Sequence, residues 1–182
     1  MTEYTAHPQD KRTRSPDRRL TSAAAVAAAI NAGVFFDFSF VIMPGLHELP
    51  AAQGISAMQA FNRTAVTPPL MLLMFGTAAL CIVLIVRAAI AWGSAAAPWT
   101  LAAGIAFLLA VGVITGAGNV PISASVDALD PASPDAAARW ADLFTQWIWW
   151  NHARVLTSIA AAAGFVLALH ARTHRPEAAR IF

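Results

Sequence analysis

The last long apolar segment of the chain begins with a polar and aromatic group: Trp147, Asn151, His152 and Arg154. On a helix, spacings of four and three residues place Trp147, Asn151 and Arg154 on one face. His152 lies about 100° further round from Asn151. An imidazole can act as a general base, and amide or guanidinium groups can donate hydrogen bonds to a developing oxyanion. The group therefore predicts a base-assisted site, and the alternative is an interfacial aromatic belt with Arg154 reaching lipid headgroups.

Two more polar residues lie in earlier apolar segments, toward the ends that we expect, from the charge pattern described below, on the outer side of the membrane. Asn119 ends the third segment, where its amide is expected either to bind a ligand and orient His152 or only to cap a helix. Asp37 lies within the first segment, and an ionisable residue at that depth is a site hypothesis by default. We expect Asp37 to act as a second catalytic base, or to form a structural ion pair with Arg154 or Arg63.

A short helix is predicted over residues 55–65, between the first and second apolar segments. Gln59 and Arg63 are one turn apart on this helix, so they are expected either to roof the site or to form its solvated side. His47 follows Pro44-Gly45, a helix-breaking pair, and is expected in a surface loop. No pair of histidines at helical spacing supports a metal site here, and neither a metal nor another cofactor is predicted.

The composition excludes an ordinary soluble domain. Of the 182 residues, 58% are hydrophobic and 12% are charged, with a mean hydropathy of +0.57, whereas soluble domains are about a quarter charged. The composition also excludes a disordered chain, because disordered chains are less hydrophobic and more highly charged. The single cysteine, Cys81, excludes an internal disulfide framework and a multi-cysteine zinc site. No phosphate-binding loop or nucleophile elbow is present, and nothing indicates a nucleic-acid partner.

Four apolar segments are long enough to cross about 30 Å of hydrocarbon as helices. They run over approximately residues 20–43, 68–92, 98–118 and 150–169. Pro44-Gly45 and Pro121 are expected to end the first and third helices. The pattern predicts an all-α membrane protein, a four-helix transmembrane bundle with a short outer helix in its first loop.

The fourth helix is predicted to extend well beyond the membrane. Ser133-Pro134-Asp135 is typical of a helix start, and a long run without proline or glycine comes after it. A single helix over residues 134–172 has a length of roughly 58 Å. Gly112 and Gly116, one turn apart on the third helix, are expected to allow the close approach that brings Asn119 to the fourth.

The positions of the basic residues predict the orientation in the membrane. Lysine and arginine gather before the first span, at the end of the second and after the fourth. The other flanks hold Arg63, Arg139 and several acidic residues. We therefore expect both termini in the cytoplasm of a bacterium, with residues 46–67 and 120–149 on the outer side of the inner membrane.

The same pattern divides the chain into one domain and two tails. Residues 1–19 are polar and are expected to be a disordered cytoplasmic tail, and residues 172–182 a second tail. The transmembrane domain is expected at residues 20–171. We expect no cleaved signal, because the first apolar run is longer than a typical signal segment.

Several motifs come one after another in a set order: Gly33-Val34-Phe35-Phe36, Phe38-Ser39, Met43-Pro44-Gly45-Leu46, Met58-Gln59, Asn62-Arg63, Gly118-Asn119-Val120-Pro121 and Trp150-Asn151-His152-Ala153-Arg154. This ordered set, over about residues 30 to 168, resembles the anthrone-oxygenase-like family. The resemblance implies a four-helix integral membrane protein. Some fungal members of that family oxidise anthrones to anthraquinones, whereas most bacterial members have no assigned activity.

Two main hypotheses for the function remain. In the first, a base removes a carbon-bound proton from a lipophilic aromatic, and the carbanion reacts with O₂ without an obligatory metal; His152 is the expected base. The residues expected to bind this substrate are Asn119, Asn151, Arg154, Trp147, Gln59 and Arg63. In the second, the protein is not catalytic and binds a lipid or small ligand, or supports a partner. A transporter is less favoured, because the chain has only four spans, one intramembrane acid and no internal repeat from which to build a path for a transported solute or proton.

Overall fold

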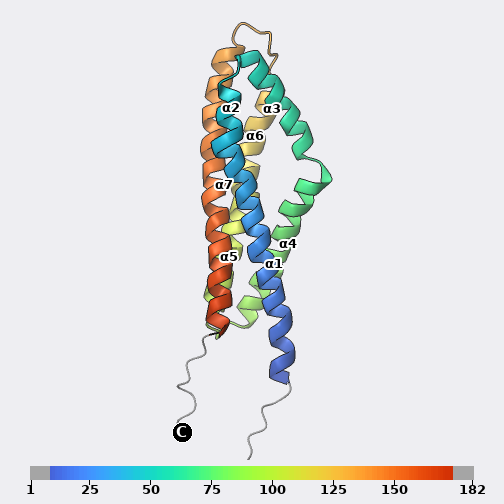
Figure 1. Ribbon diagram of the computed structural model, residues 1–182, viewed down its shortest axis with the longest axis vertical. Helices are drawn as coiled ribbons and strands as arrows, with labels where there is room; N and C mark the ends of the chain where they lie inside the picture. The colour runs from blue at the N-terminus through green and yellow to red at the C-terminus, as the bar shows by residue number, and fades with distance from the viewer. Residues whose placement is uncertain (1–8, 174–182) are drawn as a thin grey trace, which may run out of the picture.

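The structure is a computed structural model that describes residues 9–173, and its helices form an elongated bundle (Figure 1). The segments are, in chain order, α1 (Gln9–Asp37), η1 (Phe38–Ile42), α2 (Met43–His47), α3 (Ala51–Ala65), α4 (Pro68–Ile90), α5 (Ala97–Leu108), η2 (Leu109–Asn119), α6 (Val120–Asp127) and α7 (Ala136–Thr173). The segments η1 and η2 are π-helical and continue the helices on either side of them.

Four of the continuous helical stretches are long and apolar enough to cross a membrane. They are Asp17–His47, Pro68–Ile90, Ala97–Asp127 and Ala136–Arg172. The predicted all-helical, four-span membrane fold is therefore confirmed. The predicted short helix is present as α3, and α7 runs as one unbroken helix along the whole bundle (Figure 1).

Two prolines that were predicted to end helices lie inside continuous helical stretches instead. Pro44 and Pro121 each come just after a π-helical segment. The backbone N–H groups of Met43 and Val120, immediately before the prolines, donate to carbonyl oxygens five residues back. This wider turn relieves the clash that a proline ring makes with the preceding turn of an α-helix. The predicted ends of the first and third helices are thus wrong, and His47 ends α2 rather than lying in a loop.

The first turns of α1 also differ from the prediction. Residues 9–19 were expected to be disordered, but they are helical. The carboxylate of Asp17 forms an ion pair with Arg87 at the end of α4, and Arg172 Nη1 of α7 lies 3.8 Å from Asp17 Oδ2. These contacts hold the beginning of α1 against two other helix ends. The remaining tail residues, 1–8 and 174–182, lie outside the described part of the chain.

Small residues set how closely the helices pack. Helix α7 packs along α1, α5 and η2. A Cβ added at Gly164 of α7 would lie 2.9 Å from the Cβ of Ala103 in α5, so these two helices touch through glycine. The expected close approach at Gly112 and Gly116 is wrong, because a Cβ at either would meet nothing within 4 Å. The π-helical turns of η2 carry different residues toward α7 than an α-helix would.

The end of the bundle that contains α2, α3 and α6 has a core of its own. Helices α2, α3, α6 and the first half of α7 enclose buried apolar side chains, among them Met43, Ile55, Val126 and Trp140. A second core of alanine, phenylalanine and leucine joins α1, α4, α5 and the second half of α7. The candidate site lies where these two cores meet.

Candidate functional site

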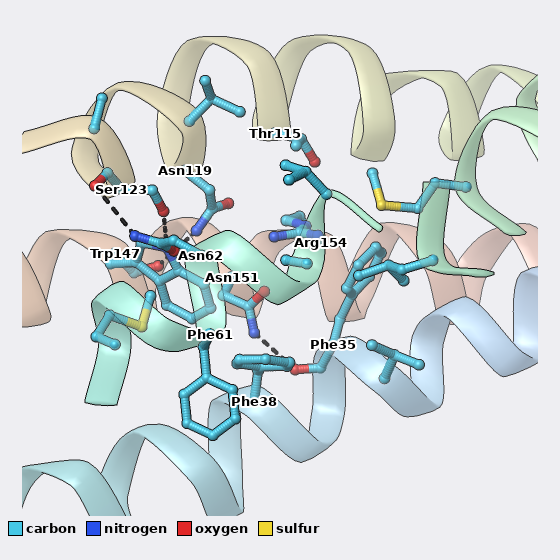
Figure 2. Close-up of a pocket in the computed structure, with 18 of the residues that line it drawn as sticks. Phe35, Phe38, Phe61, Asn62, Thr115, Asn119, Ser123, Trp147, Asn151 and Arg154 are labelled. Carbon is cyan, nitrogen blue, oxygen red and sulfur yellow. Dashed lines mark hydrogen bonds between the residues drawn. The ribbon is translucent and has the colours of Figure 1, made fainter. Parts of the chain in front are cut away.

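A cavity of about 300 Å³ lies between α1, α3, α4, η2, α6 and α7 (Figure 2). Its walls are mostly apolar and include the aromatic rings of Phe35, Phe38, Phe61 and Trp147. A few polar side chains from η2, α3, α6 and α7 also line it. A largely apolar hollow with a small number of convergent polar groups is the usual form of a small-molecule site.

Four of the predicted substrate-binding residues line this cavity together. Trp147, Asn151 and Arg154 lie on one face of α7, as their spacing predicted, and Asn119 comes from the end of η2. The Asn119 Nδ2 donates a hydrogen bond of 3.1 Å to the carbonyl oxygen of Trp147, which joins η2 to α7. Their role in binding a substrate remains a prediction.

Hydrogen bonds fix how the two buried asparagines present their amides. Asn151 Nδ2 donates to the Phe35 carbonyl and to Ser39 Oγ, each at 2.7 Å, and Asn119 Nδ2 donates to α7. The Oδ1 atoms of both asparagines are buried and have no hydrogen-bond partner in the described part of the chain. An unpaired buried acceptor costs about 1–3 kcal/mol. Two such acceptors beside one cavity suit a ligand that carries hydroxyl donors.

Arg154 is the cation of the site, and it is 8% exposed. Its Cζ lies 3.8 Å from the centre of the Phe35 ring, and its Nε has no hydrogen-bond partner. Within the described residues it forms no ion pair with a carboxylate. Figure 2 shows the side chain at the cavity wall, and the ring of Phe35 lies against it. A buried charge is expensive unless it is paired, so this guanidinium is suited to an oxygen that carries negative charge.

A second polar group, largely missed by the sequence analysis, lines the cavity nearer the α3–α6 contact. Asn62 Nδ2 of α3 donates to Asp127 Oδ1 at 2.9 Å and to the Ser123 carbonyl at 3.2 Å. Trp147 Nε1 donates to Ser123 Oγ at 3.1 Å. Ser123 and Asp127 are one turn apart, a spacing that would have indicated a shared face had the helix been expected to continue past Pro121.

Asp37 does not form the predicted pair with Arg154. Its side chain is exposed, while Arg154 is buried, and no ion pair links them. Phe35, two residues earlier on α1, faces Arg154 instead. Two residues correspond to about 200° of helical rotation, so Asp37 lies on the opposite side of α1 from the cavity.

His152 lies beside the site but not in the cavity wall. Its Nδ1 is 3.0 Å from Ser39 Oγ, the hydroxyl that also accepts from Asn151. Its ring stacks on Phe40 with the centroids 5.0 Å apart, and it meets Trp149 edge to face. Ser39 and Asn151 therefore separate the imidazole from the cavity.

Gln59 and Arg63 do not line the cavity. Gln59 Nε2 donates to the carbonyl oxygens of Val126 and Leu129, at 3.0 and 2.9 Å. It therefore provides hydrogen bonds to carbonyl groups at and just beyond the C-terminal end of α6, where the helix itself has no donors left. Arg63 is exposed. The cavity face of α3 is instead formed by Met58, Phe61, Asn62 and Ala65, which agree with helical spacing.

The described residues contain no group of three histidine, cysteine, aspartate or glutamate side chains arranged to hold a metal ion. His47, one of the histidines considered for such a role, stacks on Phe144 with the ring centroids 4.6 Å apart.

Comparison with known proteins adds one finding. The sequence matches the family described as anthrone oxygenase over residues 70–164, just over half of its 182 residues. The match includes α4 from its third residue, α5, η2, α6 and much of α7, and so Asn119, Asn151 and Arg154. No curated protein and no solved structure matches the chain. The chain belongs to the anthrone oxygenase family.

Proposed function

We propose that this protein oxygenates a lipophilic aromatic ketone of the anthrone type with O₂ at the cavity between α3, η2 and α7. The reaction converts a ring methylene to a carbonyl: one oxygen atom of O₂ enters the new C=O group and the other leaves as water. The observation that carries the proposal is the buried, unpaired Arg154 at the wall of an otherwise apolar, aromatic-lined cavity.

The walls of the cavity suit a flat, apolar substrate. Phe35, Phe38, Phe61 and Trp147 present rings to it, and aromatic side chains favour offset or edge contacts with other rings. A tricyclic ring system is largely apolar, so burial in such a cavity removes apolar surface from water or lipid headgroups. The substrate would bind among these rings with its oxygen atoms toward the polar residues.

Arg154 would stabilise the negative charge that forms during the reaction. Loss of a methylene proton from an anthrone leaves an enolate, whose charge resides mainly on the ketone oxygen. A positioned donor in a low-dielectric site stabilises such an oxyanion strongly, because it needs no reorganisation at the moment of reaction. Hydroxyl groups on the ring next to the ketone would donate to Asn119 Oδ1 and Asn151 Oδ1, the two unpaired acceptors.

The substrate would reach the cavity sideways, from the bilayer. Ala65, Val66 and Leu70 line the cavity at the corner between α3 and α4, which stands away from the rest of the bundle in Figure 1. Val66 is 68% exposed, and a side chain of this type at the rim is compatible with lipid. A lipophilic substrate dissolved in the membrane would thus not have to pass through water.

The proposal is tested with purified protein in lipid nanodiscs, anthrone and O₂, by measuring O₂ consumption and formation of anthraquinone. Anthrones also oxidise slowly without an enzyme, so rates are compared with protein-free nanodiscs. Arg154→Met should lower kcat/KM by about 100- to 1,000-fold, the usual effect of removing an oxyanion donor. Arg139→Met, an exposed arginine on the same helix, should leave it unchanged.

Binding of anthrone without turnover by the wild-type protein would favour the alternative function, a membrane protein that binds a small ligand without catalysis. Equal turnover in wild type and Arg154→Met would show that the cavity cation takes no part in the reaction.

A further inference from the structure

We infer that Asp127 is the catalytic base of this reaction; the inference rests on the proposed function. Among the residues that line the cavity, only Asp127 and Arg154 carry an ionisable side chain. Arginine stays protonated in proteins and cannot accept a proton. The amides and hydroxyls of the other polar lining residues are not bases near neutral pH, which leaves the carboxylate of Asp127.

Two helices hold this carboxylate at the rim of the cavity. Asp127 is the last residue of α6, and its Oδ1 accepts a 2.9 Å hydrogen bond from Asn62 Nδ2 of α3. Asn62 is itself anchored, because the same nitrogen donates to the Ser123 carbonyl. Within the described residues no partner occupies the other oxygen, Oδ2, so one oxygen is positioned and the other is open to a substrate.

Asp127 and Arg154 stand at different levels of the cavity. Trp147 bonds to Ser123, next to the Asn62–Asp127 contact, and Arg154 comes two turns later on α7. Two turns correspond to roughly 10 Å along the helix axis. The carboxylate and the guanidinium form no ion pair, so neither neutralises the other.

This separation fits the chemistry of the substrate. In an anthrone the ketone and the reactive methylene lie on opposite sides of the central ring. A molecule bound with its ketone oxygen toward Arg154 therefore turns its methylene toward Asp127. One end of the cavity would accept the proton while the other holds the charge that the proton leaves behind.

Atoms and electrons balance in this reaction. A methylene C–H bond breaks, the proton passes to Asp127 Oδ2, and the electron pair enters the ring system as the enolate. O₂ takes electrons from the enolate and forms a C–O bond, and the proton from Asp127 converts the resulting peroxide to a hydroperoxide. Asp127 then takes the second proton of that carbon as the O–O bond breaks, which gives the new carbonyl and a hydroxide ion. The hydroxide takes this proton back from Asp127 and leaves as water, so the carboxylate is restored.

His152 is a positioning residue in this scheme. Asn151 donates to Ser39 Oγ, and His152 Nδ1 lies 3.0 Å from the same oxygen, so the imidazole is a second hydrogen-bond partner of this hydroxyl whichever of the two groups donates. The contact fixes Ser39, and through it the orientation of the Asn151 amide beside the cavity. The imidazole has no direct route to a substrate carbon.

The test separates proton removal from oxygenation. Anthrone is incubated with the protein in nanodiscs, in D₂O and without O₂, and deuterium incorporation at the methylene is measured by mass spectrometry. The wild-type protein should accelerate exchange above protein-free nanodiscs. Asp127→Asn, which keeps an oxygen for Asn62, should lose about 100- to 10,000-fold of this acceleration, as expected for removal of a general base.

Matched variants show whether the slower exchange comes from loss of the base or from damage to the fold. Asp142→Asn, an exposed aspartate of α7 outside the cavity, should exchange like the wild type. Asp127→Ala leaves room for a small acid, so added formate should restore part of its exchange and turnover, which a misfolded protein would not show. His152→Ala should retain measurable exchange, with a raised KM for anthrone.

The outcomes for Asp127 and for the function itself are distinguishable. Wild-type exchange rates in Asp127→Asn, alongside normal wild-type turnover, would overturn the role of Asp127 and leave the proposed function standing. The role would also be overturned if formate failed to restore Asp127→Ala while this variant remained folded and bound anthrone. If the wild-type protein neither exchanges nor oxidises anthrone, the proposed function fails, and the base assignment fails with it.

Discussion

A buried arginine without a carboxylate is the unusual residue of this protein. Arg154 gains a contact with the Phe35 ring, worth about 0.5–2 kcal/mol for a cation over an aromatic face. That contact is small beside the several kcal/mol needed to take a charged group out of water. The folded protein therefore carries an unfavourable group at its cavity. Unfavourable groups of this kind persist where an interaction with a ligand requires them.

This imbalance gives a stability prediction for Arg154→Met. If Arg154 formed the ion pair with Asp37 that the sequence suggested, its replacement would leave Asp37 without a partner and lower the stability. In the structure no partner is stranded, and methionine fills a similar volume without charge. The variant should therefore be as stable as the wild type or more stable, by up to about 1–4 kcal/mol. Thermal unfolding in detergent, monitored by tryptophan fluorescence, measures this.

Arg139→Met is the control for the stability measurement, because Arg139 is exposed and its contact with Asp135 spans 3.9 Å. Its melting temperature should stay close to that of the wild type. A clear fall in the melting temperature of Arg154→Met alone would mean that the guanidinium has a stabilising partner, and the account of an unpaired cation would be wrong.

Helical spacing predicted part of the site and missed the rest for a geometric reason. Trp147, Asn151 and Arg154 lie on one unbroken helix, so residue numbers alone were enough to predict their shared face. Asp37 was assigned to the site by its expected depth in the membrane rather than by its helix face, and in the structure it lies on the side of α1 away from the cavity. Asp127 was missed because Pro121 was taken as a helix end, which placed the aspartate in a loop.

At the scale of elements, the two π-helical segments decide which side chains reach the cavity. Segment η1 contributes Phe38 to the wall, and η2 contributes Thr115 and Asn119. Each extra residue in a π-helical turn rotates the later residues of the helix away from their positions in a regular α-helix. The threonine shows this directly, since Thr115 Oγ1 donates to the carbonyl of Ala110, five residues back. Composition gives no sign of such segments, so the side chains that η2 presents could not be predicted from spacing.

Helix contacts give a second stability prediction, for Gly164→Ala. The added methyl would lie 2.9 Å from the Ala103 Cβ and 3.4 Å from its Cα, so α5 and α7 would have to separate. Overpacking of this kind usually destabilises by about 1–3 kcal/mol. Gly112→Ala is the matched variant, since a Cβ there meets nothing within 4 Å. It should be neutral or slightly stabilising, because alanine is the better helix former.

Unfolding of both variants in the same detergent, titrated with SDS, compares them directly. If Gly164→Ala proved as stable as Gly112→Ala, the close contact between α5 and α7 would be in doubt. If instead Gly112→Ala were the destabilised variant, the result would support the close helix approach at Gly112 that was expected from the sequence.

At the scale of the whole molecule, charge is distributed unequally between the two ends of the bundle. The beginning of α1 and the end of α7 lie at the same end in Figure 1, and Asp17 joins Arg87 and Arg172 there. Arg18 and Arg19 also belong to this end. The opposite end, with α3 and the loop before α7, includes the cavity and carries most of the acidic residues in the described part of the chain, namely Glu48, Asp127, Asp130, Asp135 and Asp142.

This asymmetry predicts the orientation, since short flanks rich in arginine remain in the cytoplasm. Both termini should be cytoplasmic, and the cavity should lie toward the outer leaflet. The test uses single cysteines in a Cys81→Ala background and a thiol reagent that does not cross membranes. Ala52→Cys and Ala132→Cys are exposed at one end of the bundle and should be labelled in intact cells, whereas Ser94→Cys, exposed at the other end, should react only after the cells are opened. All three positions are accessible in the fold, so a missing label reports the membrane and not burial. If Ser94→Cys alone were labelled in intact cells, the predicted orientation would be wrong. The cavity would then lie toward the cytoplasmic leaflet and receive its substrate from there.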